Sequence, residues 1–167
     1  MKKPQTNYAF IDGQNLNLSI RAMGWELDWK KFRIYLSEKY GVCKAYYFIG
    51  YVYGNNDLYN SLQSCGYLLV FKPTSIHKDG KLKGNCDAEL VLQAMIDLNE
   101  YQKAVIVTSD GDFACLVNYL RKKDKLQCVL APSWGGCSHL LKKAAQKQIA
   151  FIDNLRVKLE YKKKRTL

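Results

Sequence analysis

Short apolar runs alternate with amphipathic stretches along this chain of 167 residues. The runs are rich in β-branched and aromatic residues without a two-residue alternation, which is typical of strands buried on both faces of a parallel sheet. The predicted strands cover residues 8–11, 42–51, 67–71, 104–108, 126–130 and 150–152. Between them, apolar residues recur at helical spacing. The predicted helices begin near Gln14, after Asp28, near Asp57, after Asn85, at Phe113 and after Ser138.

This alternation of strands and helices predicts an α/β fold of three layers, a parallel sheet with helices on both faces, in one domain over residues 1–167. Right-handed crossovers carry the first three strands outwards in one direction. The strand at Ala104 must then return to the other side of the first strand. Strands 8–11 and 104–108 are therefore expected side by side at the topological switch point, where open α/β sheets bind ligands.

Four segments carry more detailed expectations. The helix after Asn85 is predicted to bury a stripe of five residues: Ala88, Val91, Leu92, Met95 and Ile96. The helix after Ser138 is predicted to run to about Gln148. Residues 73–83 carry no periodic pattern, which predicts an exposed loop or short hairpin. The chain is expected to end in a basic tail at about 156–167.

Carboxylates stand where two of these strands end. Asp110 and Asp112 follow strand 104–108 with one glycine between them, and Asp12 follows strand 8–11. Neighbouring carboxylates repel each other, and a cation would remove the repulsion. The alternative is a helix N-cap followed by a first-turn acid. If the strands are adjacent, the three acids converge in one crevice.

A fourth acid, Asp87, lies in the first turn of the helix that leads into strand 104–108. It is a candidate fourth member of the acidic cluster, because it follows Lys81, Lys83 and Gly84 and its helix leads into that strand. Compensation of the helix dipole is the alternative for this residue. Asn15, just after Asp12, is either part of the site or a cap at the entry of its helix.

The net charge of the chain indicates a class of binding partner. Lys and Arg exceed Asp and Glu to give a net charge of +11, which favours an anionic partner such as nucleic acid, although many basic surfaces serve only solubility. Lys81 and Lys83, just before Asp87, are the best-placed cations. Other cations suited to RNA, with a solvated surface as the alternative, are Lys72, Lys78, Arg121–Lys123, Lys142, Lys143, Lys147 and Lys162–Arg165. Tyr51, Tyr53 and Trp134 follow strand ends and could stack on bases, with a place in the core or its rim as the alternative.

The cysteines and the apolar runs indicate where in the cell the protein is expected. The six cysteines form no C-x-x-C pair and no zinc-ligand pattern, so reduced thiols in a cytoplasmic protein are the simplest interpretation. The apolar run near the N-terminus is too short for a signal peptide, and no stretch approaches membrane-spanning length. No membrane association is expected.

Three motifs fall in order along the chain: Phe10–Leu16, Lys83–Asp87 and Val107–Phe113. Together they resemble the signature of the NYN-domain (LabA-like) family, a branch of the PIN-like nucleases, over about residues 8–155. The resemblance implies a PIN-like sheet and a divalent-metal-dependent ribonuclease site. Asp12, Asp87, Asp110 and Asp112 match the family's catalytic, metal-binding acids, and Asn15 matches its accompanying catalytic asparagine.

The chain departs from the family pattern at two places. Thr108-Ser109 stands where many members have Ser-Gly, and Cys86 stands where many have a β-branched apolar residue. Neither departure removes a carboxylate. The expected cofactor is Mg²⁺ or Mn²⁺, because such ions activate water and stabilise charge on a phosphate without a histidine base. Lys81, Lys83 and Ser109 are the expected substrate-binding residues.

The leading functional hypothesis is a metal-dependent ribonuclease. The first alternative is an RNA-binding or regulatory interaction module of the same fold with little or no turnover. The second is a phosphatase acting on a small substrate, which is disfavoured because +11 exceeds what one phosphate requires and no G-x-x-x-x-G-K motif is present. The identity of the RNA, endo- or exonuclease action, and the number of ions stay open. So does the oligomeric state, with a homodimer among the options.

Overall fold

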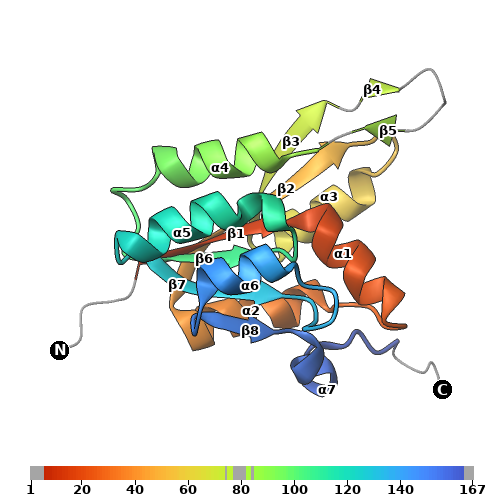
Figure 1. The fold of residues 1–167 in the computed structure, drawn as a ribbon. Coiled ribbons are helices and arrows are strands. Elements are labelled where there is room, and N and C mark those ends of the chain that lie inside the picture. The colour runs from red at the N-terminus through yellow and green to blue at the C-terminus, as the bar shows by residue number, and fades with distance from the viewer. Residues whose placement is uncertain (1–5, 74, 77–81, 84, 164–167) are drawn as a thin grey trace.

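The computed structural model describes residues 6–73, 75–76, 82–83 and 85–163 (Figure 1). Within these residues the main sheet has six parallel strands in the order β3-β2-β1-β6-β7-β8. Their bounds are β1 Asn7–Asp12, β2 Val42–Tyr51, β3 Tyr67–Pro73, β6 Ala104–Val107, β7 Leu126–Ala131 and β8 Ile149–Phe151. This order confirms the α/β fold and the return of the fourth long strand to the side of the first.

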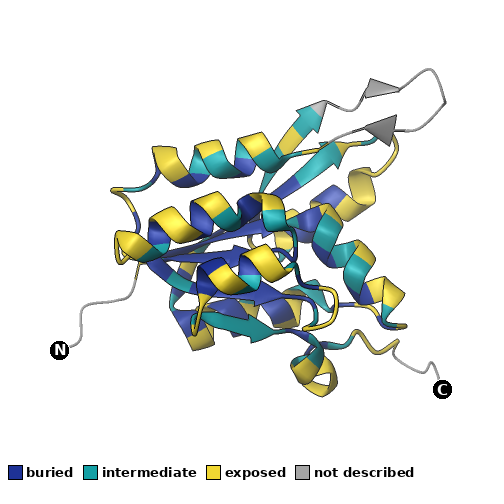
Figure 2. Cartoon of the chain, viewed as in Figure 1, coloured by how far each residue is buried: buried dark blue, intermediate teal, exposed yellow. Residues whose placement is uncertain are grey.

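Helices cover both faces of the sheet, so the fold has three layers (Figure 1). One face packs against α1 Gly13–Ala22, α2 Trp29–Tyr40, α3 Asn56–Ser64 and the short α7 Arg156–Leu159. The other packs against α4 Asp87–Ile96, α5 Ala114–Lys122 and α6 His139–Ala145. Two 3₁₀ turns, η1 Gly111–Phe113 and η2 Asp153–Leu155, precede α5 and α7. Figure 2 shows that burial is concentrated in the central strands between these layers.

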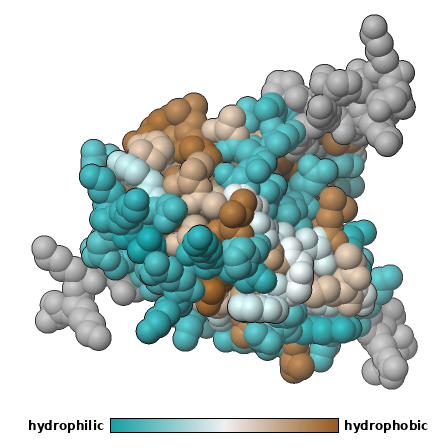
Figure 3. Space-filling model, in the orientation of Figure 1, coloured by the Kyte–Doolittle hydropathy of each residue, from teal (hydrophilic) through white to brown (hydrophobic). Residues whose placement is uncertain are grey.

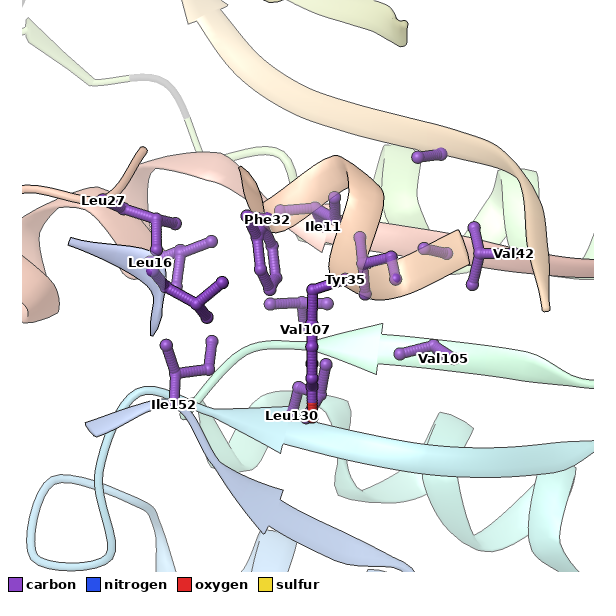
Figure 4. Close-up of a cluster of buried hydrophobic side chains, with 14 of the residues drawn as sticks. Ile11, Leu16, Leu27, Phe32, Tyr35, Val42, Val105, Val107, Leu130 and Ile152 are labelled. Carbon is purple, nitrogen blue, oxygen red and sulfur yellow. The ribbon is translucent and has the colours of Figure 1, made fainter. Parts of the chain in front are cut away.

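Two apolar cores result, one on each face of the sheet. Successive residues of a strand point to opposite faces, so Phe10 packs into one core and Ile11 into the other, and neither is exposed. Figure 4 shows the second of these cores, where Ile11, Val107 and Leu130 from three neighbouring strands meet Phe32 of α2. Burial on both faces explains why the strands are continuous apolar runs.

The ends of α2 follow the local signals in the sequence. The Asp28 carboxylate accepts a hydrogen bond from the backbone N of Lys31 at 3.0 Å, which caps the first turn. Gly41 ends the helix with φ of 64°, a left-handed conformation that glycine adopts without a steric penalty. The start after Asp28 agrees with the prediction from the sequence.

The stripe predicted for α4 is wrong. The residues that face the sheet are Leu90, Ala94 and Asp97, whereas Leu92 and Ile96 are 60% and 63% exposed. Ala88 and Met95 are also exposed, and Val91 is half-buried. A polar residue is tolerated at the C-terminal end of this buried face because the Tyr46 hydroxyl donates a hydrogen bond of 2.6 Å to the Asp97 carboxylate. The apolar residues left outside form a hydrophobic patch over α4 (Figure 3).

Two other segments depart in extent from the prediction. Helix α6 ends at Ala145 rather than near Gln148, because Gln146 turns to φ of 55° and the chain then enters β8. Residues 156–160 of the expected basic tail fold onto the domain. Leu159 is fully buried, and Glu160 forms a β-bridge with Leu27.

The segment expected as a loop or hairpin contains two short antiparallel strands, β4 Ser75–Ile76 and β5 Leu82–Lys83. Residues 77–81 between them lie outside the described residues, as do the side chains of both strands. The six cysteines are all free thiols. None of the helices formed by the described residues has both the length and the apolar character of a membrane span.

Candidate metal centre and active site

The predicted crevice opens at the switch point of the sheet. Strands β1 and β6 run in parallel register, with Ile11 opposite Val107, so the residues that follow them emerge at the same edge. A cleft of about 370 Å³ lies there, and it is lined by Asp12, Asn15, Asp87 and Asp110 among others. In Figure 1 the start of α1 and the η1 turn lie next to each other at this edge.

Three carboxylates in this region form one cluster. Asp87, Asp110 and Asp112 each present an oxygen, and the three oxygens lie within 4.8 Å of one another. Asp87 and Asp110 are half-buried, and Asp112 is exposed. Oxygens that share one Mg²⁺ or Ca²⁺ ion at about 2.0–2.6 Å lie at most roughly 4–5 Å apart, so the spacing fits a common ion.

Asp87 is held in place by its own helix start. The side-chain oxygen of Asn85 accepts from the backbone N of Asp87 at 2.8 Å, and its amide donates to the Asp87 carboxylate at 2.9 Å. Lys72 stabilises this segment, donating to the Asn85 carbonyl at 2.5 Å and pairing with Glu89 at 3.4 Å. The Asn85 side chain thus accepts a backbone hydrogen bond from the first turn of α4, although Cys86 is the residue at the N-cap position.

Asp110 has a structural role besides its place in the cluster. Its carboxylate accepts from the backbone N of Asp112 at 2.9 Å and caps the η1 turn. The N-cap interpretation and the cluster interpretation are therefore both realised at this residue. A cap needs only an acceptor, so it does not explain why Asp87 and Asp112 should lie beside Asp110.

Asp12 lies deeper in the cleft. Its two carboxylate oxygens accept hydrogen bonds from the backbone N of Asn15 at 3.3 Å and from the Thr108 hydroxyl at 3.1 Å. Burial raises the pKa of Asp12 to about 6, and the nearby charges of Asp87 and Asp110 act in the same direction. Among the described residues, Asp12 is not in the cluster of three, but it shares the cleft with Asp87 and Asp110.

Thr108 links Asp12 to the paired acids. It is fully buried, and while its hydroxyl donates to Asp12 it accepts from the backbone N of Asp110 at 3.2 Å. The next residue, Ser109, is also buried and donates both its backbone N and its hydroxyl to the side-chain oxygen of Asn15. Neither residue has a positive φ, so the turn does not require the glycine that many family members carry.

The close approach of α1 to β2 requires a glycine at position 13, where there is no room for a side chain. A Cβ at this position would overlap the ring of Tyr47 and lie 2.8 Å from the carbonyl oxygen of Phe48. The Tyr47 hydroxyl donates to the Gly13 carbonyl at 3.3 Å, which fixes the approach. The absence of a side chain at Gly13 therefore sets where Asp12 enters the cleft.

The donor set suits a hard cation. Oxygen atoms of carboxylates are the ligands that Mg²⁺, Mn²⁺ and Ca²⁺ prefer. Burial raises the pKa of Cys86 in the cleft wall to about 11, so this thiol is neutral in the metal-free protein. Burial also raises the pKa of Asp87, with the charges of Asp110 and Asp112 acting in the same direction. A bound cation would relieve this crowding.

The cations that were expected to bind the substrate lie in different environments. Lys81 lies outside the described residues, and only the backbone of Lys83 lies within them. Arg121 is half-buried and donates to the Ala144 carbonyl at 3.0 Å. Lys142 lies over the Trp134 ring at 4.2 Å. Lys162 and Lys163 are exposed.

Sequence reasoning missed two contributors to the site, Thr108 and Gly13. A polar residue directly after a buried strand was the available signal for Thr108. Gly13, between a carboxylate and a helix, had no signal of its own, because the ring that excludes a side chain comes from Tyr47.

Comparisons with known proteins agree with this fold. The family profile described as the NYN domain matches residues 8–155. A crystal structure of a protein of unknown function from Vibrio parahaemolyticus RIMD 2210633 superposes with a TM-score of 0.81 at 19% identity, covering 96% of this chain and 99% of that one. At this identity the likeness shows the fold. No curated protein matches.

Proposed function

The chain belongs to the NYN-domain family, whose members are PIN-like nucleases, and from this premise we propose that it is a divalent-metal-dependent ribonuclease. The proposed reaction is hydrolysis of RNA phosphodiester bonds at the acidic cleft. The observation that carries the proposal is the group of three carboxylate oxygens, from Asp87, Asp110 and Asp112, within 4.8 Å of one another at the switch point.

The proposed metal ligands are Asp12, Asp87, Asp110 and Asp112, and Mg²⁺ or Mn²⁺ suits their oxygen atoms. Such an ion, when bound, supplies an activated water at neutral pH and stabilises the charge that develops on the phosphate. No imidazole lines the described part of the cleft, which supports metal-assisted chemistry over catalysis by a histidine base.

The remaining polar residues of the site act by positioning these acids. Asn85 orients the Asp87 carboxylate through two hydrogen bonds. Thr108 orients Asp12 and at the same time ties it to the backbone of Asp110. We assign Asn15 and Ser109 to the same task, because the Ser109 hydroxyl is buried and donates to Asn15 instead of facing the cleft.

RNA is proposed as the substrate because the protein as a whole carries a net charge of +11, although its cleft is itself acidic. Cationic side chains beside such a cleft are required to attract a polyanion to it. We propose Lys81 and Lys83 as these cations on one side of the cleft, since they directly precede the Asn85–Asp87 segment in the chain. We place the reaction in the cytoplasm, where six free thiols are stable.

A cleavage assay tests this function. Single-stranded and structured RNAs are incubated with the parent protein in Mn²⁺, in Mg²⁺ and in EDTA, beside Asp110→Asn and a control, Asp153→Asn. Asp153 suits the comparison because its carboxylate also accepts a backbone hydrogen bond at a 3₁₀ turn, from Asn154 at 2.8 Å, but it lies outside the cluster.

We expect cleavage by the parent and by Asp153→Asn in the metal ions, none in EDTA, and a loss of at least a hundredfold in Asp110→Asn. RNA binding without cleavage in either metal would instead favour the non-catalytic binding module. Equal cleavage by all three proteins would move the reaction away from the acidic cluster.

A further inference from the structure

A second cavity, of about 320 Å³, adjoins the acidic cleft. The two share four lining residues: Gln14, Leu18, Ile49 and Gly50. The second cavity lies between α1 and the start of α3, over the carboxyl-terminal half of β2. A ligand group in it would therefore be a direct neighbour of anything held at the carboxylates.

The wall of this cavity is aromatic and aliphatic. Trp29 and Tyr47 meet edge to face, with ring centroids 5.2 Å apart, and Tyr47 is almost completely buried. Leu58 of α3 and Leu18 of α1 line the opening and are 39% and 58% exposed. Exposed leucines around a cavity leave apolar surface that a flat, apolar group can cover.

Polar groups are interleaved with this apolar wall. Asn17 and Asn55 line the cavity, and within the described part of the chain neither side chain has a hydrogen-bond partner. Each side-chain amide offers two N–H donors and one carbonyl oxygen as an acceptor. Arg21 also lines the cavity, in an ion pair with Glu26 at 3.6 Å in which both side chains are more than half exposed. Such exposed pairs contribute little, so the guanidinium can turn towards a phosphate.

We propose that this cavity binds one nucleobase of single-stranded RNA, the base of a nucleotide next to the bond that is cleaved. A nucleobase has an apolar face and an edge of hydrogen-bond donors and acceptors, which matches the apolar surface of Leu18, Leu58 and Trp29 and the polar Asn17 and Asn55 amides. The neighbouring phosphates have the acidic cleft on one side and Arg21 on the other. The inference rests on the proposed ribonuclease function, from which it takes the identity of the polymer.

Single-stranded RNA follows as the substrate class. A base inside a helix is stacked on both faces and cannot enter a cavity, whereas an unpaired base can leave the strand. The net charge of +11 favours a polyanion over a peptide or a lipid chain as the occupant. Asn17 and Asn55 would then give the cavity a preference among the four bases.

The test measures binding in EDTA, so that it does not depend on cleavage. Fluorescence anisotropy reports the affinity for a labelled tetranucleotide and for the same sugar–phosphate backbone without bases. The variant Leu58→Trp fills the cavity from α3. Leu92→Trp is its matched control, a leucine on α4 that is 60% exposed and lies outside the cavity.

We expect the parent and Leu92→Trp to bind the tetranucleotide at least roughly tenfold more tightly than the abasic backbone, since stacking of a base supplies an effect of that size. In Leu58→Trp the affinity for the tetranucleotide should fall to that for the abasic backbone. A Leu58→Trp variant that folds and binds the tetranucleotide as tightly as Leu92→Trp overturns the proposal.

If Leu58→Trp does not fold, Asn17→Ala carries the test against Asn60→Ala, an exposed asparagine of α3 outside the cavity. Asn17→Ala should change the ranking of the four homopolymeric tetranucleotides, and an unchanged ranking overturns the proposal. Free nucleoside monophosphates are added as competitors. Displacement at equal concentration would identify a free-nucleotide site and would also overturn it.

These outcomes separate the two proposals. An effect of Leu58→Trp on binding, without cleavage by the parent in Mn²⁺, contradicts the ribonuclease and leaves the base-binding cavity standing. Cleavage in Mn²⁺ with no effect of Leu58→Trp contradicts the cavity alone.

Discussion

Asn15 and Ser109, which are 94 positions apart in the chain, are joined by two hydrogen bonds to one oxygen. The side-chain oxygen of Asn15 accepts from the backbone N of Ser109 at 2.9 Å and from its hydroxyl at 3.0 Å. This connection holds the first turn of α1 against the turn that follows β6. It thereby fixes the position of Asp12 relative to Asp110, the two acids delivered by neighbouring strands.

Asn15→Ala should destabilise the fold by about 1–3 kcal/mol, because it leaves the buried backbone N of Ser109 without an acceptor. Ser109→Ala removes only the hydroxyl and should cost about 1 kcal/mol. Urea unfolding in EDTA measures both, with Asn60→Ala as a control expected within about 0.5 kcal/mol of the parent. Equal stabilities of Asn15→Ala and Asn60→Ala would show that the connection does not hold the site together.

The raised pKa of Asp12 predicts an unusual pH dependence. Folding raises this pKa from 3.8 to about 6, so the folded protein binds the proton more tightly than the unfolded chain does. The free energy of unfolding without metal should therefore fall as the pH rises from about 4 to about 6, by up to roughly 3 kcal/mol from this group.

Asp12→Asn should remove most of this slope and melt higher than the parent at about pH 7 in EDTA. Urea titrations between about pH 4 and pH 7 provide the measurement, with Asp153→Asn expected to follow the parent. A parent whose stability rises over this range as steeply as that of Asp12→Asn would contradict the burial of an ionised Asp12.

Gly13→Ala should destabilise the protein by about 1–3 kcal/mol, because the added methyl group overlaps the Tyr47 ring and the rigid Phe48 carbonyl. Gly135→Ala is the control, since nothing lies within 4 Å of a Cβ at that position. Differential scanning calorimetry of the two variants should give a lower melting temperature for Gly13→Ala alone. Similar melting temperatures would mean that α1 can shift away from β2 without cost.

The convergence of Asp12 with Asp110 could be predicted from the sequence because it depends on topology. Buried runs mark the strands, right-handed crossovers order them, and parallel strands deliver their carboxyl ends to one edge. The phase of α4 could not be predicted in this way. Leu90 and Leu92 are equally apolar, and the buried face includes Asp97, whose hydrogen-bond partner Tyr46 lies 51 positions away.

The same limit applies to the connections within the site. The carboxylates could be identified because they stand out as charges at strand ends, and their family motifs fall in order. Their partners could not, because Thr108 meets Asp12 across 96 positions. The second cavity is formed by side chains from four elements, α1, α2, β2 and α3, and the turn after β2, so no local pattern marks it.

The basic C-terminal segment predicts a change in salt dependence. Deleting residues 162–167 removes four cations, Lys162 to Arg165. RNA affinity should fall for all sequences alike, and the slope of log affinity against log salt should decrease by about 0.7 for each phosphate that these cations neutralise in the parent. Binding measured over a range of KCl concentrations gives this slope. An unchanged slope would assign the segment to solubility.

The central claim, that the acidic cleft binds a divalent ion in the folded protein, is tested most directly by thermal melting of the parent and Asp110→Asn in EDTA and in Mn²⁺. An ion that binds only the folded state at a hundredfold excess over Kd adds about 2.7 kcal/mol, which should raise the Tm of the parent by roughly 5–10 °C. Asp110→Asn should melt higher than the parent in EDTA, because it removes one repelling charge while asparagine still caps η1, and should gain less from Mn²⁺. A parent Tm that does not respond to Mn²⁺, together with a lower Tm for Asp110→Asn in EDTA, would contradict the claim.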